Sequence, residues 1–472
     1  MIKKNVIKGL SFLLIVSFAL GTTSWLLKDK NTTLSCLYSE PDNTIDVAII
    51  GSSHVNNGYI PNILWKECSA SAVNVFSWSQ PMWISYHYLQ ETLKTQSPKI
   101  VVLDMFGMTY GHSYIMPQEI DKTSYNNSFN IDFGVNFLQM IKTVEFCGLD
   151  LRNAEDFLPL VRYHTRWKNL DLDQALYNPH KDPDKLKGYG IAANVYQAEK
   201  PCFSSEVITE PYEYSIQYID KIVELCNKNN IDIIFTMVPY VFNEAEYGIN
   251  NWIKNYADEN DVPFLNYNDE DGDRIGIDFG TDLSDNGHVN INGALKITYD
   301  LCEYINKNYK FDREENYNKI QLDKDYEYAE RVIKVQSILT AQDIHSWIEQ
   351  VVNDKSMTLF IIDKEGNNDI SKLLNNYNIN CPPEIKSVVK NRDGTIFNID
   401  VISYDLFGRA GNVCFDYSNN TILLNDTKVM VESKDILIVM YDEILERPLS
   451  CVSYDDKFTQ REFTSDILNL YK

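Results

Sequence analysis

The sequence lacks the residue patterns of a metal enzyme. Its nine cysteines and seven histidines are spread along 472 residues, with no Cys-x-x-Cys pair and no His-x-x-x-His pair. Zinc sites typically use such closely spaced ligands. The cysteines are too few, and odd in number, for a disulfide scaffold, although an isolated bridge remains compatible. We therefore expect neither a metal nor another cofactor.

Positive charge is also scarce. The chain has 43 Lys and Arg residues against 67 Asp and Glu residues, which gives a formal net charge of -24. Nucleic-acid binding depends on Lys and Arg that neutralise phosphates, so no nucleic-acid partner is expected. The simplest interpretation of the acidity is solubility. The sequence has no evident repeat, and its length accommodates two or three domains.

A long charge-free run stands at the N-terminus. Lys3, Lys4 and Lys8 precede residues 9–27, a run long enough to cross a hydrocarbon core. The lysines predict a cytoplasmic N-terminus, a single pass through the cytoplasmic membrane and an extracytoplasmic remainder. A cleaved signal peptide is the alternative, because residues 19–21 resemble a small-x-small cleavage site. The apolar run continues past that site to Leu27, which favours an uncleaved anchor.

Beyond the anchor, short apolar runs alternate with helical patterns. The helical patterns cover 83–93 and 213–229, and a third helix is expected to begin at an Asn292 cap. This alternation predicts an α/β fold, a three-layer αβα sandwich with a parallel sheet. Its strands are expected at 45–50, 73–76, 100–103, 231–236 and 264–267. In such sheets the site lies at the carboxyl ends of the strands, where segments 77–80 and 104–107 should converge with Ser53.

The pattern changes near residue 341. Strand-like runs separated by turn-like segments, Asn419-Asn420 and Asn425-Asp426, predict a smaller, β-rich second domain. The expected strands are 358–362, 397–403, 411–416, 421–424, 429–432, 436–441 and 449–454. The predicted segments are a tail (1–8), an anchor (9–27), a polar stalk (28–44), the α/β domain (45–310) with an insertion (about 105–207), a linker or connecting helix (311–340) and the β-rich domain (341–472).

Two motifs carry the candidate chemistry. Gly51-Ser52-Ser53 follows the first predicted strand, and Asp285-x-x-His288 precedes the last helix. A serine needs a base to accept its proton, and a carboxylate can orient that base. Each motif also has an ordinary interpretation, a helix-capping serine or an Asp-rich solvated loop. Their order and their strand and helix context favour a Ser-His-Asp site.

Residues 45–310 resemble the SGNH (GDSL-type) hydrolase superfamily. The first motif resembles its Gly-Asp-Ser block, and Asp285-x-x-His288 resembles its last block. The resemblance implies that Ser53 is the nucleophile, His288 the base and Asp285 its orienter. The Gly-Ser-Ser-His form resembles a bacterial membrane-anchored branch related to polysaccharide and teichoic-acid O-acyl-transfer proteins.

The sequence departs from this family at two blocks that supply oxyanion donors. Ser79 aligns with the second-block glycine, and its backbone N–H can still donate. The third block, Gly-x-Asn-Asp in the family, aligns with residues 103–107, where Asp104 stands and asparagine is missing. Loss of one such donor typically costs on the order of a hundredfold in rate. Asp104 and the Ser53 and Ser79 backbones are therefore the oxyanion and substrate candidates.

Further candidates lie in the insertion and beside the nucleophile. Arg162, His164 and Arg166 form a polar segment that either contacts substrate or is a solvated helix face. His54 adjoins Ser53 on a turn and points elsewhere, so we expect packing or support of the site from it.

The C-terminal domain, 341–472, resembles the interleukin-like, epithelial-transition-inducer type of β-rich domain, on segments 401–414 and 435–455. That resemblance implies carbohydrate binding, and a structural accessory role is the alternative. The whole sequence predicts an extracytoplasmic esterase or O-acyltransferase acting on acyl groups, acetyl above all, of cell-surface polysaccharide. A membrane acyl-donor protein is a conceivable partner. The alternative is a membrane-tethered glycan-binding or envelope-assembly protein with a degenerate hydrolase domain.

Overall fold

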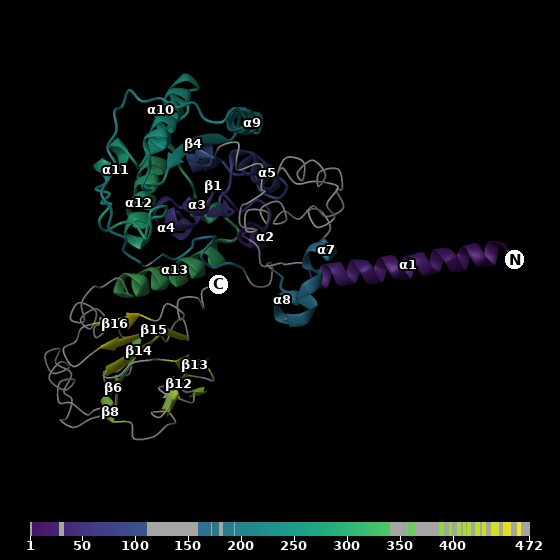
Figure 1. Ribbon diagram of the computed structural model, residues 1–472, viewed down its shortest axis with the longest axis vertical. Coiled ribbons are helices and arrows are strands. Elements are labelled where there is room, and N and C mark those ends of the chain that lie inside the picture. The colour runs from purple at the N-terminus through teal and green to yellow at the C-terminus, as the bar shows by residue number, and fades with distance from the viewer. Residues whose placement is uncertain are drawn as a thin grey trace. The chain divides into compact units, whose positions relative to one another are not determined.

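The structure is a computed structural model that describes residues 2–27, 33–110, 159–170, 172–178, 183–192 and 194–339, together with Asp354 and the strands between 357 and 463. The chain divides into two compact units, Met1–Ala329 and Glu330–Lys472. Figure 1 shows the mixed helical and sheet unit, the long N-terminal helix α1 and the strands of the second unit.

A five-stranded parallel sheet forms the centre of the first unit. Its strand order is β2-β1-β3-β4-β5, and every neighbouring pair is parallel. The strands are β1 (Val47–Gly51), β2 (Ala72–Phe76), β3 (Ile100–Asp104), β4 (Asp232–Met237) and β5 (Phe264–Asn266). All residues of the first three strands are buried, as expected for a sheet that helices cover on both faces.

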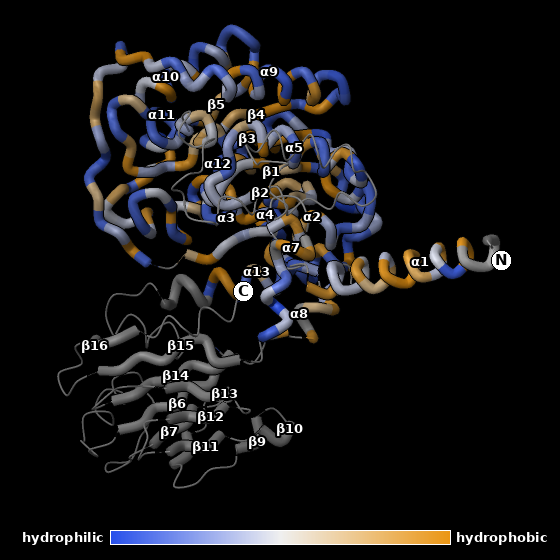
Figure 2. Tube along the Cα trace, turned by 45° about the vertical axis from the view of Figure 1, so that its right-hand side comes forward, coloured by the Kyte–Doolittle hydropathy of each residue, from blue (hydrophilic) through white to orange (hydrophobic). Residues whose placement is uncertain are grey.

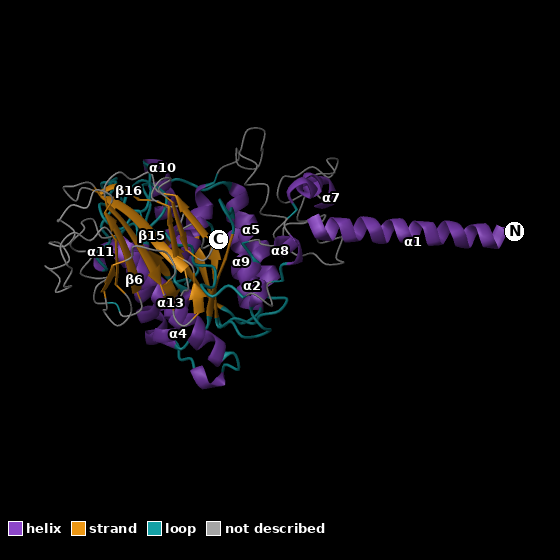
Figure 3. Ribbon diagram, turned by 90° about the horizontal axis from the view of Figure 1, so that it is seen from below, coloured by secondary structure: helices purple, strands orange, loops and turns teal. Residues whose placement is uncertain are grey.

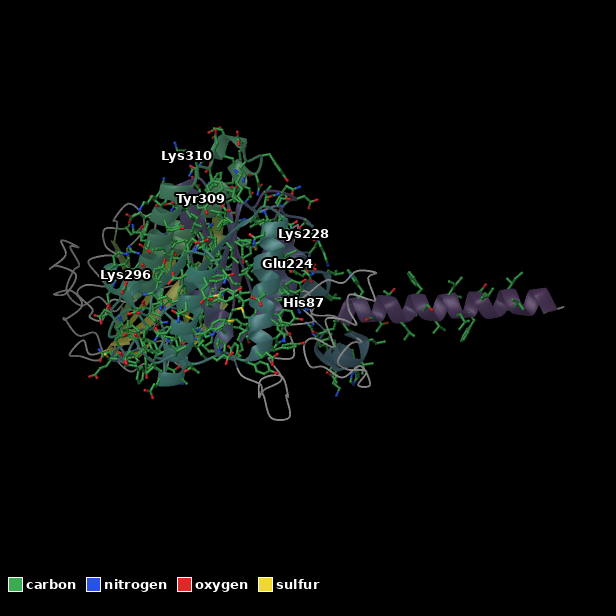
Figure 4. All side chains as sticks on the ribbon, turned by 90° about the horizontal axis from the view of Figure 1, so that it is seen from above. His87, Glu224, Lys228, Lys296, Tyr309 and Lys310 are labelled. Atoms are coloured by element: carbon green, nitrogen blue, oxygen red, sulfur yellow. The ribbon has the colours of Figure 1, made fainter. Side chains whose placement is uncertain are left out.

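Helices cover the two faces of this sheet in separate groups. Helix α4 packs on α12, and α5 packs on α9. Figure 2 shows α9 and α10 near β4 and β5, and α3 and α4 near β2; in Figure 4 His87 of α5 lies beside α9. The helices are α3 (Ser53–Gly58), α4 (Pro61–Cys68), α5 (Met82–Thr92), α9 (Glu213–Lys228), α10 (Glu244–Glu259), α11 (Glu270–Arg274) and α12 (Ile291–Asn308). The three-layer αβα sandwich is confirmed.

The strand order of the sheet reverses direction at β1. The chain moves outward from β1 to β2 on one side, then returns past β1 to β3 on the other. The connections after β1 and β2 therefore lie on opposite faces, and the carboxyl end of β1 is the topological switch point. Ser53 follows β1 at this point.

The N-terminal helix α1 (Ile2–Leu27) contains a 22-residue stretch, Val6–Leu27, that is long and apolar enough to cross a membrane. By these criteria it is either an anchor or a signal sequence. The polar stalk predicted after it is not seen over residues 33–44. There, helix α2 (Ser35–Ser39) packs on β2, and Leu34, Cys36 and Leu37 are buried. These few apolar residues cover the sheet edge, so this stretch belongs to the folded unit.

The predicted linker contains a long helix, α13 (Lys319–Leu339), whose Leu322, Ala329 and Val332 are buried. The N-cap of α12 lies two residues earlier than predicted, at Asn290 instead of Asn292. The Asn290 side chain accepts hydrogen bonds from the N–H groups of Asn292 and Gly293.

The described part of the second unit is β-rich, as predicted. A six-stranded sheet has the order β16-β15-β14-β6-β7-β8, beside a three-stranded and a two-stranded sheet, and all pairings are antiparallel. Its strands are β6 (Met357–Asp363), β7 (Ser387–Lys390), β8 (Ile396–Asn398), β9 (Tyr404–Leu406), β10 (Arg409–Gly411), β11 (Val413–Asp416), β12 (Thr421–Leu424), β13 (Thr427–Met430), β14 (Ile436–Asp442), β15 (Arg447–Tyr454) and β16 (Gln460–Phe463). The predicted turns at 419–420 and 425–426 lie outside the described residues, as does the predicted strand beyond residue 398.

Candidate active site

A tight strand-to-helix turn presents Ser53. Strand β1 ends at Gly51, and Ser52 caps α3 by accepting a hydrogen bond from the His54 N–H at 3.3 Å. A Cβ atom at Gly51 would lie 2.6 Å from Cγ2 of Val55 and 2.7 Å from Cβ of Asp104, so the turn requires glycine. Ser52 takes the capping role that was an alternative for Ser53, which leaves the Ser53 hydroxyl available for chemistry.

A second turn, residues 284–288, presents His288. The Ser284 N–H donates to the His288 carbonyl at 2.8 Å, and the Gly287 N–H donates to Oδ1 of Asp285 at 2.7 Å. Leu283 forms antiparallel bridges to both Tyr196 and Val289 at the base of this turn. The buried Asn290 side chain donates to three backbone carbonyls nearby, those of Asn194, Thr281 and Leu283. The turn is therefore fixed on both sides before α12 begins.

The two turns bring Ser53, His288 and Asp285 together. Oγ of Ser53 lies 2.8 Å from Nε2 of His288. On the other side of the ring, Nδ1 lies 2.9 Å and 3.0 Å from the two carboxylate oxygens of Asp285. A carboxylate can only accept, so the proton belongs on Nδ1 and the lone pair of Nε2 faces the serine hydroxyl. This tautomer is the one that a general base for Ser53 needs.

The site is open to solvent. The His288 side chain is 28% exposed and that of Asp285 is 54% exposed, while Ser53 is half-buried. The Coulomb attraction between an exposed carboxylate and an imidazolium is weakened by water. Asp285 therefore acts here mainly by fixing the orientation and tautomer of His288.

The ring of His54, which contacts His288, packs among aromatic side chains that follow two other strands. The ring of His54 stacks on that of Phe106, with centroids 3.8 Å apart, and meets the edge of Tyr240 at 5.4 Å. The His54 ring also makes an edge contact with His288 at 5.6 Å. Burial, and secondarily the nearby His288, holds the pKa of His54 well below its usual value. His54 is therefore a neutral packing partner of the base, as its sequence position led us to expect.

Buried asparagines hold the nucleophile helix in place. Asn56 Nδ2 donates to the Gly188 carbonyl at 2.8 Å, and the Gly190 N–H donates back to the Asn56 carbonyl at 2.7 Å. Asn74 of β2 donates to the carbonyls of Val55 and Tyr59. Sequence reasoning missed both asparagines. The available signal was a polar residue, Asn74, inside an apolar buried strand, where an unpaired amide would be costly.

Asp104 does not offer a group to a substrate. It is buried, and its two carboxylate oxygens accept hydrogen bonds from the N–H groups of Phe106 and Val238, both at 3.3 Å. Burial raises the pKa of Asp104 from 3.8 to about 7. It joins the ends of β3 and β4 beneath the site, which corrects its prediction as an oxyanion or substrate residue.

Ser79 keeps a backbone that favours glycine. Its φ is +52°, in the left-handed region that side-chain-bearing residues seldom adopt. Thus the chain makes a glycine-like turn after β2 at Ser79. The segments after β2 and β3 also meet as expected, since a Cβ atom at Gly107 would lie 2.8 Å from the Gln80 carbonyl oxygen.

The basic candidates of the insertion lie elsewhere. Nη1 of Arg166 donates to the Leu27 carbonyl at 3.2 Å, at the end of α1, and His164 is exposed and contacts the Val161 carbonyl. Arg162 lies on α7 (Pro159–Tyr163), which packs on α1. The structure does not bring this group to Ser53, because the insertion folds here against the N-terminal helix. Residues 111–158 of the insertion lie outside the described residues.

A hydroxyl, an imidazole and a carboxylate in hydrogen-bonded sequence at the switch point of a doubly wound sheet define a Ser-His-Asp site. Within the described residues, no group of three His, Cys, Asp or Glu side chains is placed to hold a metal ion.

Comparison with known proteins gives distant structural similarities. No protein-family model and no curated protein matches the chain. Among solved structures, a protein provisionally described as an acylhydrolase from Bacteroides fragilis shares 13% identity, covers 58% of this chain and 94% of its own, and gives a TM-score of 0.29. A GDSL-like lipase from Bacteroides thetaiotaomicron shares 13% identity over 55% of this chain and 87% of its own, with a TM-score of 0.27. At these TM-scores neither similarity identifies a function.

Proposed function

We propose that the chain is an extracytoplasmic serine esterase or O-acyltransferase that acts on O-acyl groups, acetyl above all, of cell-surface polysaccharide. The observation that supports the chemistry is the 2.8 Å contact between Ser53 Oγ and His288 Nε2, with Asp285 on Nδ1. Without a neighbouring base, serine is a poor nucleophile. With it, the hydroxyl can attack an ester.

The geometry supports a two-step acyl transfer. As Ser53 Oγ bonds to the ester carbonyl carbon, its proton passes to His288 Nε2. The tetrahedral intermediate expels the sugar oxygen, which takes that proton, and an acyl-serine remains. Water or a second sugar hydroxyl then attacks the acyl carbon while His288 Nε2 accepts its proton. The second tetrahedral intermediate breaks its bond to Ser53 Oγ, which takes that proton back as the free acid or the new ester leaves. The two acceptors give hydrolysis and transfer, and a membrane acyl-donor protein could load Ser53 in the second case.

Backbone groups are the remaining oxyanion donors. Ser53 is the first residue of α3, so its N–H has no acceptor within the helix. The Ser79 N–H on the left-handed turn after β2 is the second candidate. Because Asp104 is directed into the backbone beneath the site, no third-block side chain replaces the missing asparagine. We therefore propose an enzyme with a weaker oxyanion hole than the complete family pattern would provide.

An exposed aromatic residue favours a carbohydrate substrate. Trp78 is 47% exposed beside Ser79, at the carboxyl end of β2. A flat aromatic face can pack against the apolar face of a sugar ring while its edge remains in water. The apolar α1 and the sugar-binding resemblance of the second domain agree with a substrate at the cell surface.

The alternative is a membrane-tethered glycan-binding or envelope-assembly protein with an inactive site. The observation that favours it is the absence of an asparagine at the third block, where Asp104 is buried. This alternative predicts polysaccharide binding that survives Ser53→Ala and His288→Ala, with no acyl release by the wild type.

Acetate release from acetylated and unacetylated polysaccharide tests the proposal. Wild type should release acetate only from the acetylated polymer, and Ser53→Ala should lower the rate by about 10⁴-fold or more, since it removes the nucleophile. The control Ser97→Ala removes an exposed serine hydroxyl outside the Ser-His-Asp site, and its rate should match that of the wild type. Release by Ser53→Ala at the wild-type rate would rule out the proposed mechanism.

A further inference from the structure

A short segment packs around the end of α1. It comprises α7 (Pro159–Tyr163), the 3-10 helix η5 (His164–Asn169) and α8 (Leu172–Leu176), and all three contact α1. Figures 1 and 3 show α7 and α8 beside the inner end of α1, while the rest of that helix extends away. Leu27 and Ala175 are only 5% and 3% exposed, and Arg166 donates to the Leu27 carbonyl. The segment is therefore attached to the last turn of α1.

The outer surface of this segment is unusually apolar. Trp167 is 67% exposed, and Leu172 and Leu176 are 63% and 59% exposed. The two leucines lie four residues apart on α8 and are therefore neighbours on its surface. Leu170 and Val161 of the same segment are also exposed, at 39% and 37%. Single exposed apolar residues are common, but five within a short stretch mark an interaction site.

Basic residues accompany these apolar side chains. Arg166 and the exposed Lys168 flank Trp167, and residues 159–176 contain three basic and two acidic residues in a chain of net charge -24. Tryptophan, leucine and basic residues together are typical of segments that lie in the headgroup layer of a bilayer. Anionic lipid phosphates are complementary to this local charge.

The length of α1 places a bilayer surface at the same level. The 22 residues of Val6–Leu27 extend about 33 Å at 1.5 Å per residue, close to the hydrocarbon thickness of about 30 Å. Figure 4 shows the side chains of α1 projecting from the helix along its length, as lipid contact requires. When α1 spans a membrane, residues 159–176 at its inner end meet the headgroups.

We propose that residues 159–176 form a membrane-interface segment. Trp167, Leu172 and Leu176 insert at the boundary between headgroups and acyl chains, and Arg166 and Lys168 lie near anionic phosphates. The segment adds a second attachment beside α1 and so restricts how the first unit turns at the membrane surface. This inference is independent of the chemistry proposed for Ser53.

Tryptophan quenching by brominated phosphatidylcholine in liposomes that hold the full chain tests the inference. Trp25 lies within α1, so all proteins carry Trp25→Phe. In this background, adding Trp167→Phe should remove most of the fluorescence that the lipid quenches. The matched control Trp252→Phe, on α10 of the folded unit, should leave the quenched fluorescence unchanged. Bromine near the headgroup end of the chain should quench more than bromine near its tail.

A second variant checks the apolar face without changing a tryptophan. Leu172→Asp with Leu176→Asp should reduce quenching of Trp167 at least severalfold while circular dichroism stays the same. Quenching that does not depend on Trp167 would overturn the inference. So would protection of Trp167 from both brominated lipid and aqueous iodide, because a protein partner or a second copy would then cover this face.

Discussion

His288 is held by contacts from several separate segments. Asp285 lies on its Nδ1 side, Ser53 lies on its Nε2 side, and the ring of His54 contacts it at an edge. The rings of Phe106 and Tyr240 in turn pack against His54. Since His54 is buried and neutral, it packs against the base without placing a charge beside it. These contacts form because the parallel sheet brings the loops after β1, β3 and β4 to the same edge.

Asp104 should make stability depend on pH. The folded chain keeps the proton of Asp104 up to about pH 7, whereas an unfolded chain releases it near 3.8. The folded state therefore binds more protons between these values, and its stability falls as pH rises through this window. From pH 5 to 8 the wild type should lose about 3 kcal/mol relative to Asp104→Asn, at 1.36 kcal/mol per unit of pKa difference.

Thermal unfolding of both proteins in detergent from pH 5 to 8 measures this effect. Asp258→Asn, on the exposed end of α10, is the control and should follow the wild type. Parallel pH curves for wild type and Asp104→Asn would show that the carboxyl group is not held protonated by burial.

The sequence predicted the site residues that stand in recognisable short motifs. It did not predict residues whose role depends on contacts between segments far apart in the chain. Ser53, Asp285 and His288 could be predicted because they stand in short motifs beside recognisable strands and helices. Tyr240 and Phe106 could not, since their contacts with His54 arise only when the strand order is known. Arg166 was misplaced because its partner, the Leu27 carbonyl, is 139 residues away.

At the scale of elements, a buried lysine joins three parts of the first unit. Nζ of Lys187 lies 2.6 Å from Oε1 of Glu40 and 2.7 Å from Oδ2 of Asp325, and all three side chains are buried. Glu40 follows α2, and Asp325 lies on α13. The Lys187 carbonyl accepts from the Asn74 N–H, next to the Gly188 carbonyl that holds Asn56. The ion pairs thus support the turn that fixes the nucleophile helix.

Replacing this lysine should be strongly destabilising. Lys187→Met leaves two buried carboxylates without their counterion, which typically costs about 3–5 kcal/mol. The matched control is Lys200→Met, which breaks an exposed ion pair with Asp273 and should cost at most about 1 kcal/mol. The unfolding midpoints of the two variants measure the difference, and equal midpoints would contradict a structural role for the buried cluster.

The elements themselves were largely predictable from sequence. Buried parallel strands have continuous apolar runs, so the five predicted parallel strands differ from the observed ones by at most two residues at either end. In the second unit, β7, β9 and β16 had no such run and were not predicted. The stretch 33–44 was predicted as a stalk because polar residues dominate it. Only the fold shows that Leu34, Cys36 and Leu37 are enough to attach it to β2.

At the scale of the whole molecule, charge is distributed unevenly along the chain. Helix α1 is apolar and residues 159–176 are apolar and locally basic, whereas the chain as a whole carries a net charge of -24. Repulsion between this acidity and anionic headgroups would hold the rest of the chain away from the membrane surface. We propose that the catalytic site then acts in the aqueous layer next to the membrane.

The central claim is that Ser53 is an activated nucleophile. Intact-mass spectrometry after reaction with a fluorophosphonate tests it directly, because the probe bonds to Oγ with loss of fluoride. The wild type should gain one adduct, mapped by peptide analysis to Ser53, and His288→Ala should slow its formation by about 10³-fold or more because the base is gone. An unlabelled wild type, or equal labelling of Ser53→Ala, would contradict the account.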